Sequence, residues 1–204
     1  MSVFTCSLSA DRFVRAYRAA SSETTRYYLC GVQIEPDPAG DGALLVATDG
    51  RIMLCLRDLS AQIEGSAIVQ ADKPTLAAAR HKKADRVVVE DNQLRVLDQW
   101  SQVLHIQAGP ALVDGSFPAW RRVFPRETAK RVALSGFDSD LLANLGAALC
   151  AGKTPYVALF GDEPLSPALV VGTLENAFGV LMPARHEPVV DTSWIDLPAA
   201  SEAA

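Results

Sequence analysis

The stretch VATDGRIML, residues 46–54, places an aspartate and a glycine between two short apolar runs. A carboxylate in this position could act as a general base, or it could hold a turn through its own oxygens. Asp-Gly between alternating apolar residues is the strongest short-range signal for a β-hairpin, and turn aspartates usually accept backbone N–H bonds. Asp49 is therefore predicted to turn the chain unless a catalytic partner lies nearby.

Potential catalytic partners for Asp49 are few. The three histidines, His81, His105 and His186, are isolated, and the chain has no nucleophile elbow, phosphate-binding loop or zinc-protease motif. The cysteines lie far apart, without the paired spacing of a zinc site or a disulfide framework. The sequence predicts a protein that is not an enzyme and uses no metal or cofactor. A hydrolase built from Asp49, His105 and a serine is the enzymatic alternative.

Composition places the chain among ordinary soluble proteins. It has 204 residues, of which 49% are hydrophobic and 21% charged, and its formal net charge is −5. That charge does not by itself indicate a nucleic-acid partner, although the distribution of charge still matters. The N-terminus lacks a signal-peptide pattern, and no apolar run reaches the ~20 residues of a membrane span. We therefore expect a cytoplasmic protein with no membrane partner.

The elements around the hairpin recur three times as a β-α-β-β-β unit. Helices are expected where apolar residues recur at helical spacing after a capping side chain such as Ser9 or Asp72. The first unit has a strand over 3–8, a helix over 9–20 and strands over 26–36, 43–48 and 51–58. The second has a strand over 66–70, a helix over 72–83 and strands over 85–91, 92–98 and 101–107. The third has a strand over 130–136, a helix over 136–150 and strands over 155–162, 167–174 and 176–184.

These units predict an α+β fold with two structured parts. Residues 1–124 should form a domain of two units, and residues 125–185 a linker plus the third unit. Residues 186–204, rich in Pro, Ala and acidic residues, are expected to form a disordered tail. A unit without a mate in its own chain exposes strand edges. Either the first two units or another subunit should cover it, and we expect a homo-oligomer.

Basic side chains gather on the first two predicted helices. Six of them are predicted to point away from the core: Arg12, Arg15, Arg18, Arg80, Lys82 and Lys83. The third helix instead carries Asp138 and Asp140 and no basic residue. The basic faces are either a surface for nucleic-acid phosphates or a solvated surface whose long side chains cover apolar groups.

Four stretches, in order, carry a resemblance to a known family. They are TRYYLCGVQIEP (25–36), VATDGRIML (46–54), DGSFPAWRRVFP (114–125) and FGVLMPAR (178–185). The chain resembles the bacterial DNA polymerase III β subunit, or sliding clamp, family, as a shortened clamp-like protein. Residues 1–124 are similar to the family's middle domain and 130–185 to the second half of its last domain. The resemblance implies a DNA-clamp fold of three β-α-β-β-β units, with helices on one face of antiparallel sheets.

The resemblance also implies two binding surfaces. Helices of the family line a channel around duplex DNA, which would place Tyr27 and Tyr28 near the duplex together with the six basic residues. An apolar pocket of the family binds short peptides, and its counterparts here would be Leu29, Thr48, Gly50, Pro118, Arg122, Val123, Val180, Met182 and Pro183. Arg51 and Met53 should border this pocket. The family reads Gly-His-Arg-Leu where this chain reads Gly50-Arg51-Ile52-Met53, so peptide specificity should differ.

The function predicted from these features is a sliding-clamp-like, DNA-binding processivity or tethering factor for DNA replication. It would bind duplex DNA non-specifically and dock peptide motifs of polymerases or repair proteins. A homo-oligomer is expected, a two-fold dimer first and a tetramer second. The alternative is a clamp-derived interaction module, an adapter or clamp competitor that does not encircle DNA.

Overall fold

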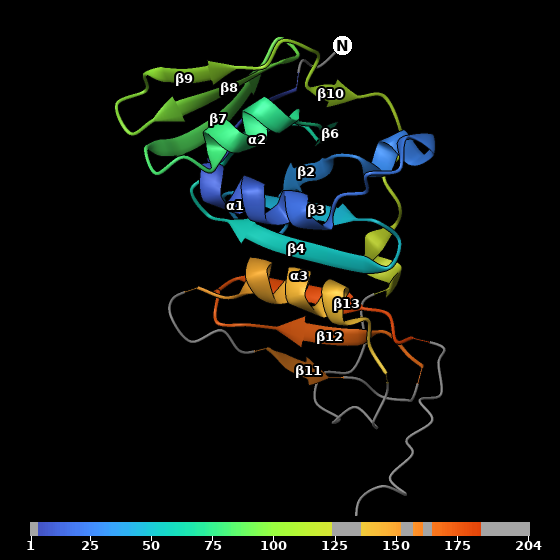
Figure 1. Cartoon of the computed structure of the whole chain (residues 1–204). Coiled ribbons are helices and arrows are strands. Elements are labelled where there is room, and N and C mark those ends of the chain that lie inside the picture. Colours follow the sequence, from blue (N-terminus) through green and yellow to red (C-terminus); the bar gives the residue numbers. More distant parts are fainter. Residues whose placement is uncertain (1–3, 124–135, 152–156, 161–164, 185–204) are drawn as a thin grey trace, which may run out of the picture.

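Repeated sheet-and-helix units build the fold over the residues that the structure describes (Figure 1). This computed structural model describes residues 4–123, 136–151, 157–160 and 165–184. The predicted strand over 130–136, apart from Gly136, and the predicted tail over 186–204 lie outside the described residues. The division of the chain near residue 124 also falls there, so it stays a prediction.

The first unit begins with a strand that leads directly into a capped helix. The Ser9 hydroxyl accepts a hydrogen bond from the Arg12 N–H, and Asp11 lies in the first turn, where the helix dipole favours a negative charge. Its elements are β1 (Thr5–Ser9), α1 (Ala10–Ala16), the 3-10 helices η1 (Tyr17–Ala19) and η2 (Thr24–Leu29), β2 (Val32–Pro36), β3 (Ala43–Thr48) and β4 (Ile52–Asp58).

The prediction of one strand over 26–36 was wrong in its first half, which forms η2. Two hydrogen bonds keep this segment out of the sheet. The Tyr17 hydroxyl donates to the Cys30 carbonyl at 2.7 Å, and the Ser21 N–H donates to the Leu29 carbonyl. The backbone at Gly31 also packs so closely that a β-carbon would lie 2.7 Å from the Val69 carbonyl oxygen. The regular strand can therefore begin only at Val32.

The second unit repeats the arrangement, with Asp72 as the helix cap. Its carboxylate accepts from the Thr75 N–H at 2.8 Å, and Pro74 occupies the first turn. Its elements are β5 (Gln62–Glu64), β6 (Ala67–Val69), α2 (Lys73–Ala79), β7 (Ala84–Glu90), β8 (Gln93–Asp98), β9 (Val103–Ile106) and β10 (Leu112–Val113). The helix predicted over 72–83 is shorter than expected, so its basic end lies in the turn before β7.

The third unit follows the 3-10 helix η3 (Trp120–Val123). Its described elements are α3 (Ser139–Leu149), β11 (Ala158–Phe160), β12 (Ala168–Val171) and β13 (Ala177–Leu181). Asp138 caps α3 by accepting from the N–H groups of Asp140 and Leu141. One of the two acids of this predicted helix is therefore its N-cap.

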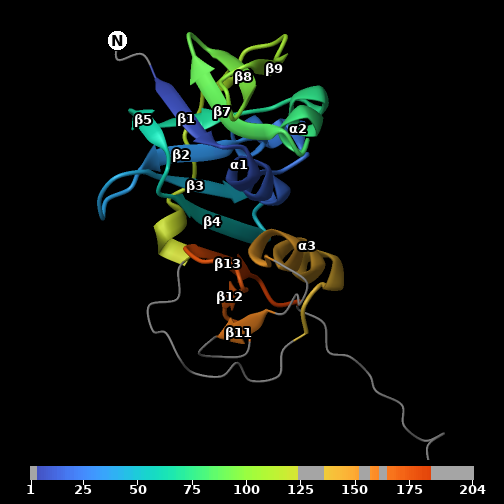
Figure 2. The ribbon, with the colours of Figure 1, turned by 90° about the vertical axis from the view of Figure 1, so that its left-hand side faces the viewer.

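Two antiparallel sheets connect the three units (Figures 1 and 2). A five-stranded sheet has the order β5-β1-β7-β8-β9, and an eight-stranded sheet has the order β10-β6-β2-β3-β4-β13-β12-β11. In the larger sheet, β4 pairs with β13, with Ile52 opposite Leu181 and Leu56 opposite Ala177. Of the two predicted ways to cover the third unit, the structure shows the first, because the last strand of this unit extends the sheet of the first unit.

The eight-stranded sheet is apolar on both faces around the β4–β13 junction. Alternate residues of β4 point to opposite faces, so Ile52, Leu54 and Leu56 join the main core with α1 and α3. Met53 and Cys55 point to the other face, where they form a second cluster with Val46 and Val180. This second cluster is the floor on which the candidate site is built.

Candidate peptide-binding site and helical face

The turn between β3 and β4 is held by the side chains of Thr48 and Asp49. The Asp49 carboxylate accepts from the N–H groups of Arg51 and Ile52 at 2.8 and 2.9 Å. The Thr48 hydroxyl accepts from the Gly50 N–H and donates to the Ile52 carbonyl. Gly50 has φ +90°, a conformation that favours glycine. The prediction that Asp49 turns the chain is confirmed.

A cavity of about 180 Å³ opens beside this turn, where β4 and β13 meet η2 and η3. It is lined almost entirely by apolar atoms, with an arginine at its rim. Its lining residues are Leu29, Thr48, Gly50, Arg51, Ile52, Met53, Pro118, Ala119, Trp120, Val180 and Met182. Four segments far apart in the sequence therefore converge on one small apolar site, the kind of concave surface that binds ligands.

Eight of the eleven residues predicted for the pocket line this cavity. The other three are Arg122, Val123 and Pro183. Arg122 is exposed and lines a larger groove of about 1040 Å³ that shares Pro118, Ala119 and Trp120 with the cavity. Arg51, and not Arg122, is the guanidinium at the cavity itself.

Trp120 is the most important lining residue that sequence reasoning missed. It packs on the cluster of Val46, Met53 and Cys55, and the Arg121 guanidinium lies 4.2 Å from the centre of its ring. Arg121 is also paired with Glu35 on β2, which fixes η3 over the sheet. The sequence did contain one indication of this role, a tryptophan between two prolines of the predicted linker. A large aromatic side chain is uncommon in a solvent-exposed linker, so its presence indicates a packing contact. Burial raises the pKa of the Cys55 thiol within this cluster to about 12.

Arg51 connects the rim of the cavity to the third unit. Its guanidinium lies 2.8 Å from the Asp138 carboxylate, the cap of α3. The N–H of Leu141 and the Arg51 guanidinium both hold the pKa of Asp138 below its ordinary value near 3.8. The two segments on either side of the cavity are thus tied by a charge-assisted bond.

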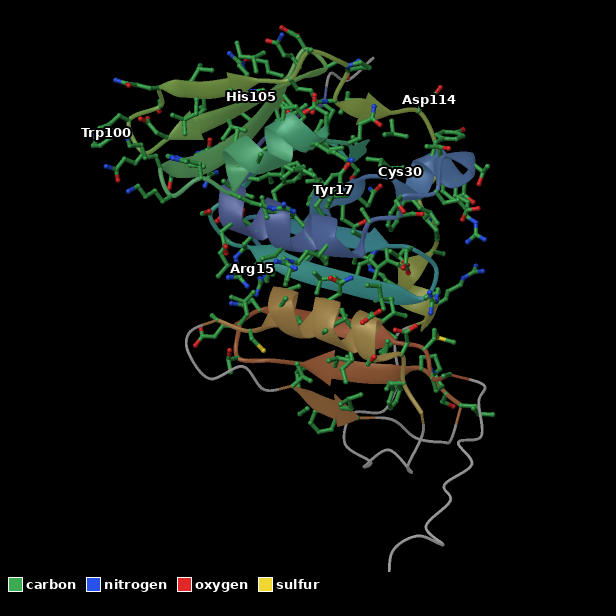
Figure 3. The ribbon with its side chains drawn as sticks, in the orientation of Figure 1. Arg15, Tyr17, Cys30, Trp100, His105 and Asp114 are labelled. Atoms are coloured by element: carbon green, nitrogen blue, oxygen red, sulfur yellow. The ribbon has the colours of Figure 1, made fainter. Side chains whose placement is uncertain are left out.

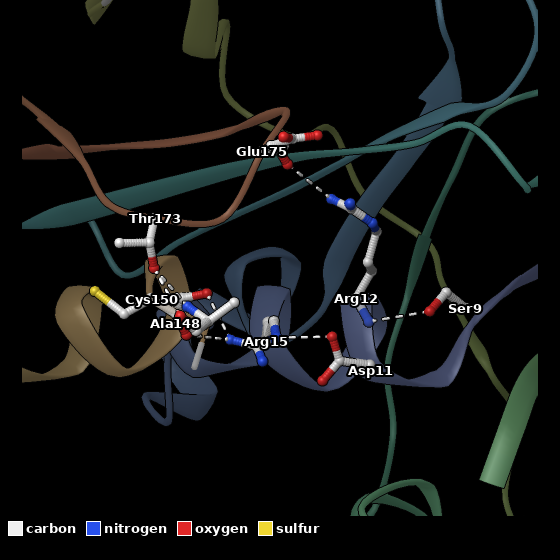
Figure 4. A network of polar contacts seen from close by, with 9 residues as sticks. Ser9, Asp11, Arg12, Arg15, Ala148, Cys150, Thr173 and Glu175 are labelled. Carbon is white, nitrogen blue, oxygen red and sulfur yellow. Dashed lines mark hydrogen bonds and ion pairs between the residues drawn. The ribbon is translucent and has the colours of Figure 1, made fainter. Parts of the chain in front are cut away.

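Arg15, one of the six basic residues predicted to face phosphates, instead binds the end of α3 (Figure 4). Its guanidinium donates to the carbonyls of Ala148 and Cys150, each at 3.1 Å, and to Asp11 at 2.7 Å. Arg12 reaches the Glu175 carbonyl at 3.5 Å. Both arginines therefore donate hydrogen bonds to backbone carbonyls of the third unit. Arg15 is better described as a structural bridge between α1 and α3.

The remaining basic residues lie on exposed positions. Arg18 follows α1 in η1, and Arg80, Lys82 and Lys83 lie after α2. Tyr27 and Tyr28 pack edge to face in η2, with ring centres 5.8 Å apart, and Tyr27 is exposed. The structure therefore groups Arg80, Lys82 and Lys83, but it does not bring the tyrosines to the helices.

Comparison with solved structures defines the fold. A sliding clamp from Pseudomonas aeruginosa matches with a TM-score of 0.65 over 90% of this chain and 67% of that chain, at 19% identity. The Bartonella birtlesii clamp, solved with bound griselimycin, matches with a TM-score of 0.63 over 89% of this chain and 66% of that chain, also at 19% identity. The fold is the DNA-clamp fold, as predicted.

Sequence relatives narrow the class further. The beta sliding clamp of Caulobacter vibrioides is 34% identical over 169 residues, which span 77% of this chain and 43% of that protein. The beta sliding clamp of Haemophilus influenzae is 29% identical over 117 residues, or 55% of this chain and 30% of that protein. No protein-family model matches. These relatives confirm the predicted resemblance: the chain is a clamp-like relative of the bacterial β sliding clamps, and it spans less than half their length.

Among the described residues, no helix is long and apolar enough to cross a membrane.

Proposed function

We propose that the protein is a clamp-like tethering factor that binds duplex DNA and docks short peptide segments of replication or repair proteins. The apolar cavity at the β4–β13 junction is the observation that carries this proposal. It combines a buried leucine, two methionines of adaptable shape and an arginine at the rim. Such a site suits a short segment with apolar anchors and an acidic or carbonyl group beside them.

The anchors of the docked segment are proposed to enter the cavity between Met182 and Trp120. Leu29 is buried on the floor, whereas the side chain of Met182 is 42% exposed at the mouth. The larger groove shares Pro118, Ala119 and Trp120 with the cavity. A peptide longer than the cavity could therefore continue over Trp120 into the groove.

DNA binding is proposed to use the exposed basic residues after α1 and α2. Arg18, Arg80, Lys82 and Lys83 are exposed and follow α1 and α2 in the chain, so they are available to phosphates. Such contacts would be independent of base sequence and sensitive to salt.

The direct test of the cavity is ligand binding by the full chain. Griselimycin, which is bound to the Bartonella birtlesii clamp of the same fold, is a suitable probe, as is a labelled clamp-binding peptide of a bacterial DNA polymerase. We expect both to bind and to compete with each other. Absence of binding by both probes would reject the peptide-docking proposal.

The second candidate function is an adapter or clamp competitor that does not encircle DNA. It is favoured by the use of Arg15 in an internal bridge, which leaves fewer basic groups on α1 than the sequence suggested. Peptide binding without DNA binding at low salt would select this alternative.

We also propose a non-enzymatic role, which the same geometry supports. The Asp49 carboxylate is occupied by two backbone N–H groups, and His105 lies in the other sheet, on β9. The hydrolase alternative would need these groups in contact. Two further expectations stay predictions: that the protein is cytoplasmic, and that it forms a dimer in preference to a tetramer.

A further inference from the structure

The segment that follows β13 carries an apolar cluster that the proposed function does not use. The predicted tail over 186–204, which lies outside the described residues, has four Asp and Glu residues and no Lys or Arg. It nevertheless contains the sequence SWIDLP over 193–198, with Trp194, Ile195 and Leu197 within four residues. Segments that stay unfolded are poor in large apolar and aromatic residues, whereas segments that dock on a surface need them as anchors. The composition of 194–197 is therefore that of a docking segment.

The three tryptophans of the chain differ in their relation to the apolar cavity. Trp120 packs on the second apolar cluster and lines the cavity. Trp100 lies at the outer tip of the β8–β9 hairpin and points away from the molecule, with 67% of its surface exposed (Figure 3). Trp194 is twelve positions after Met182, which also lines the cavity. Of the two tryptophans that do not line the cavity, only Trp194 is joined to it by a short stretch of chain.

The chain leaves the described fold beside the cavity. Met182 lies at the mouth, and two residues later the Ala184 N–H donates to the Gly136 carbonyl at 2.8 Å. Ile195 follows Ala184 by eleven positions, and an extended chain of that length spans roughly 36–40 Å. A return to the cavity beside Met182 needs only a small part of this reach. The entropic cost of closing a flexible loop also grows slowly with its length, so the connection permits docking within one molecule.

We propose that residues 194–197 dock in the apolar cavity of their own molecule and compete there with partner peptides, an inference that rests on the proposed function of the cavity. In an extended segment alternate side chains point the same way, so Ile195 and Leu197 enter the cavity together and Asp196 faces its rim. The cavity of about 180 Å³ is large enough for the ends of two such side chains, since an apolar cavity of about 150 Å³ holds a benzene molecule.

The charges at the rim favour the same placement. The side chain of Arg51 is 64% exposed, and one of its nitrogens binds Asp138. A guanidinium has five N–H donors, so Arg51 has donors for a second carboxylate. Asp196 lies between the two proposed anchors, which is where the proposed function places the acidic group of a docked segment.

A tethered segment competes at a high effective concentration, so a weak intrinsic affinity is enough. Short flexible linkers give effective concentrations of about 1 mM. A segment with an intrinsic dissociation constant of about 100 µM would then occupy roughly nine cavities in ten. A partner peptide would bind the parent protein about tenfold more weakly than it binds an open cavity.

Two double variants of the full chain test this competition. Ile195→Ser with Leu197→Ser removes the proposed anchors, and Val189→Ser with Val190→Ser makes a matched change at the other apolar pair of the tail. In fluorescence anisotropy, a labelled clamp-binding peptide should bind the anchor variant about tenfold more tightly than the parent. The control variant should bind like the parent. Trp194→Ala should act like the anchor variant by a smaller factor, whereas Trp100→Ala should have no effect.

The outcomes separate this inference from the proposed function. Equal peptide affinity in the parent and the anchor variant would overturn the inference and leave the proposed function standing. Peptide binding by neither protein would reject the proposed function, and the inference with it. A gain in affinity that disappears when the parent is diluted would assign the docked tail to a second copy and contradict docking within one molecule.

A synthetic peptide of residues 187–200 identifies the surface to which the tail binds. It should bind the anchor variant, whose cavity is open, and the further substitution Met182→Ala should weaken this binding severalfold. A tail peptide that binds equally well with and without Met182 would show that the segment docks elsewhere, which contradicts the proposal.

Discussion

Individual side chains around the TDG turn divide into those that shape the site and those that would contact a ligand. The side-chain oxygens of Thr48 and Asp49 form hydrogen bonds with four backbone groups of the turn, so these residues shape it. Met182 and Trp120 present apolar surface to the cavity instead. Substitutions in the first group should therefore affect stability, and substitutions in the second should affect binding.

Truncation of Met182 tests the binding group. Met182→Ala should weaken binding of a clamp-binding peptide by about 1–3 kcal/mol, the usual effect of removing an anchor at an interface centre. Because this side chain is half-exposed, the thermal unfolding temperature should change little. Fluorescence anisotropy of the labelled peptide measures the effect, with Leu59→Ala as the control for an exposed apolar residue away from the cavity. Leu29→Ala should weaken binding to a similar extent but also lower stability, because Leu29 is buried.

Equal peptide affinity in Met182→Ala, Leu29→Ala and the parent protein would mean that the cavity is only a packing seam between the units.

The Asp138 carboxylate provides a pH test of the contact between the hairpin and α3. Its folded-state pKa is held below the ordinary value near 3.8 by the Leu141 N–H and the Arg51 guanidinium. Its ionised form therefore stabilises the folded protein above about pH 4, and this stabilisation is lost as pH falls through the lowered pKa. Asp138→Asn keeps a capping oxygen but cannot ionise. Urea unfolding should show the variant to be less stable than the parent at pH 6, with the difference shrinking toward pH 3.

A difference between Asp138→Asn and the parent that is independent of pH over this range would show that the Arg51–Asp138 pair contributes nothing through its charge.

At the scale of elements, sequence periodicity located most strands and all three helices, because alternation and helical spacing are properties of the local chain. It failed where a tertiary contact overrides the local pattern. The YYL segment has strand-forming residues, yet the Tyr17 hydroxyl and the close packing of Gly31 against Val69 fold it into η2. The short strands β5 and β10 were missed because two or three residues carry no measurable alternation.

The lining of the candidate cavity could likewise be predicted only in part. Motif resemblance identified the residues on the hairpin, on β13 and in the linker that meet there, whereas no local pattern shows that Trp120 covers the second apolar cluster. The charged partners were also hidden, since Arg51 and Asp138 lie 87 positions apart. Such pairs depend on how β4 and β13 pair, which spacing alone does not reveal.

The helices α1 and α3 permit a test that separates structural from DNA-binding arginines. Arg15→Gln removes the bonds to the Ala148 and Cys150 carbonyls, so it should destabilise the protein by about 1–3 kcal/mol, as for hydrogen bonds from charged groups. Arg18→Gln should leave stability unchanged, lower DNA affinity at every sequence and reduce the slope of log affinity against log salt by about 1. Urea unfolding and DNA-binding titrations at several salt concentrations measure the two effects.

A sequence-selective loss of affinity in Arg18→Gln would indicate base readout and would contradict the proposed contact with phosphates.

At the scale of the whole molecule, the β4–β13 junction changes the argument for oligomerisation. The third unit was expected to be covered either by the first two units or by a second chain, and the first unit of its own chain covers β13. The described edges that remain are β5, β9, β10 and β11. The homo-oligomer, a two-fold dimer first and a tetramer second, therefore stays a prediction.

The junction also joins the cavity to the first unit, which carries Arg18. Strand pairing, the Arg15 bridge on one face and the Arg51–Asp138 pair beside the cavity all join the first and third units. Under the proposed function, a peptide docked at the cavity would be joined through these contacts to the unit that carries Arg18. That connection is what a tether between DNA and a partner protein requires.

Recruitment of a labelled clamp-binding peptide to DNA by this protein tests the tethering proposal most directly. On immobilised nicked circular DNA at low salt, the parent protein should retain the peptide, Met182→Ala should retain less peptide although it stays on the DNA, and Arg18→Gln should lower retention of both. Release of protein and peptide on linearisation would further indicate that the protein encircles the duplex. Peptide binding in solution without any retention on DNA at low salt would contradict the tether and select the adapter, and failure to bind either ligand would contradict both.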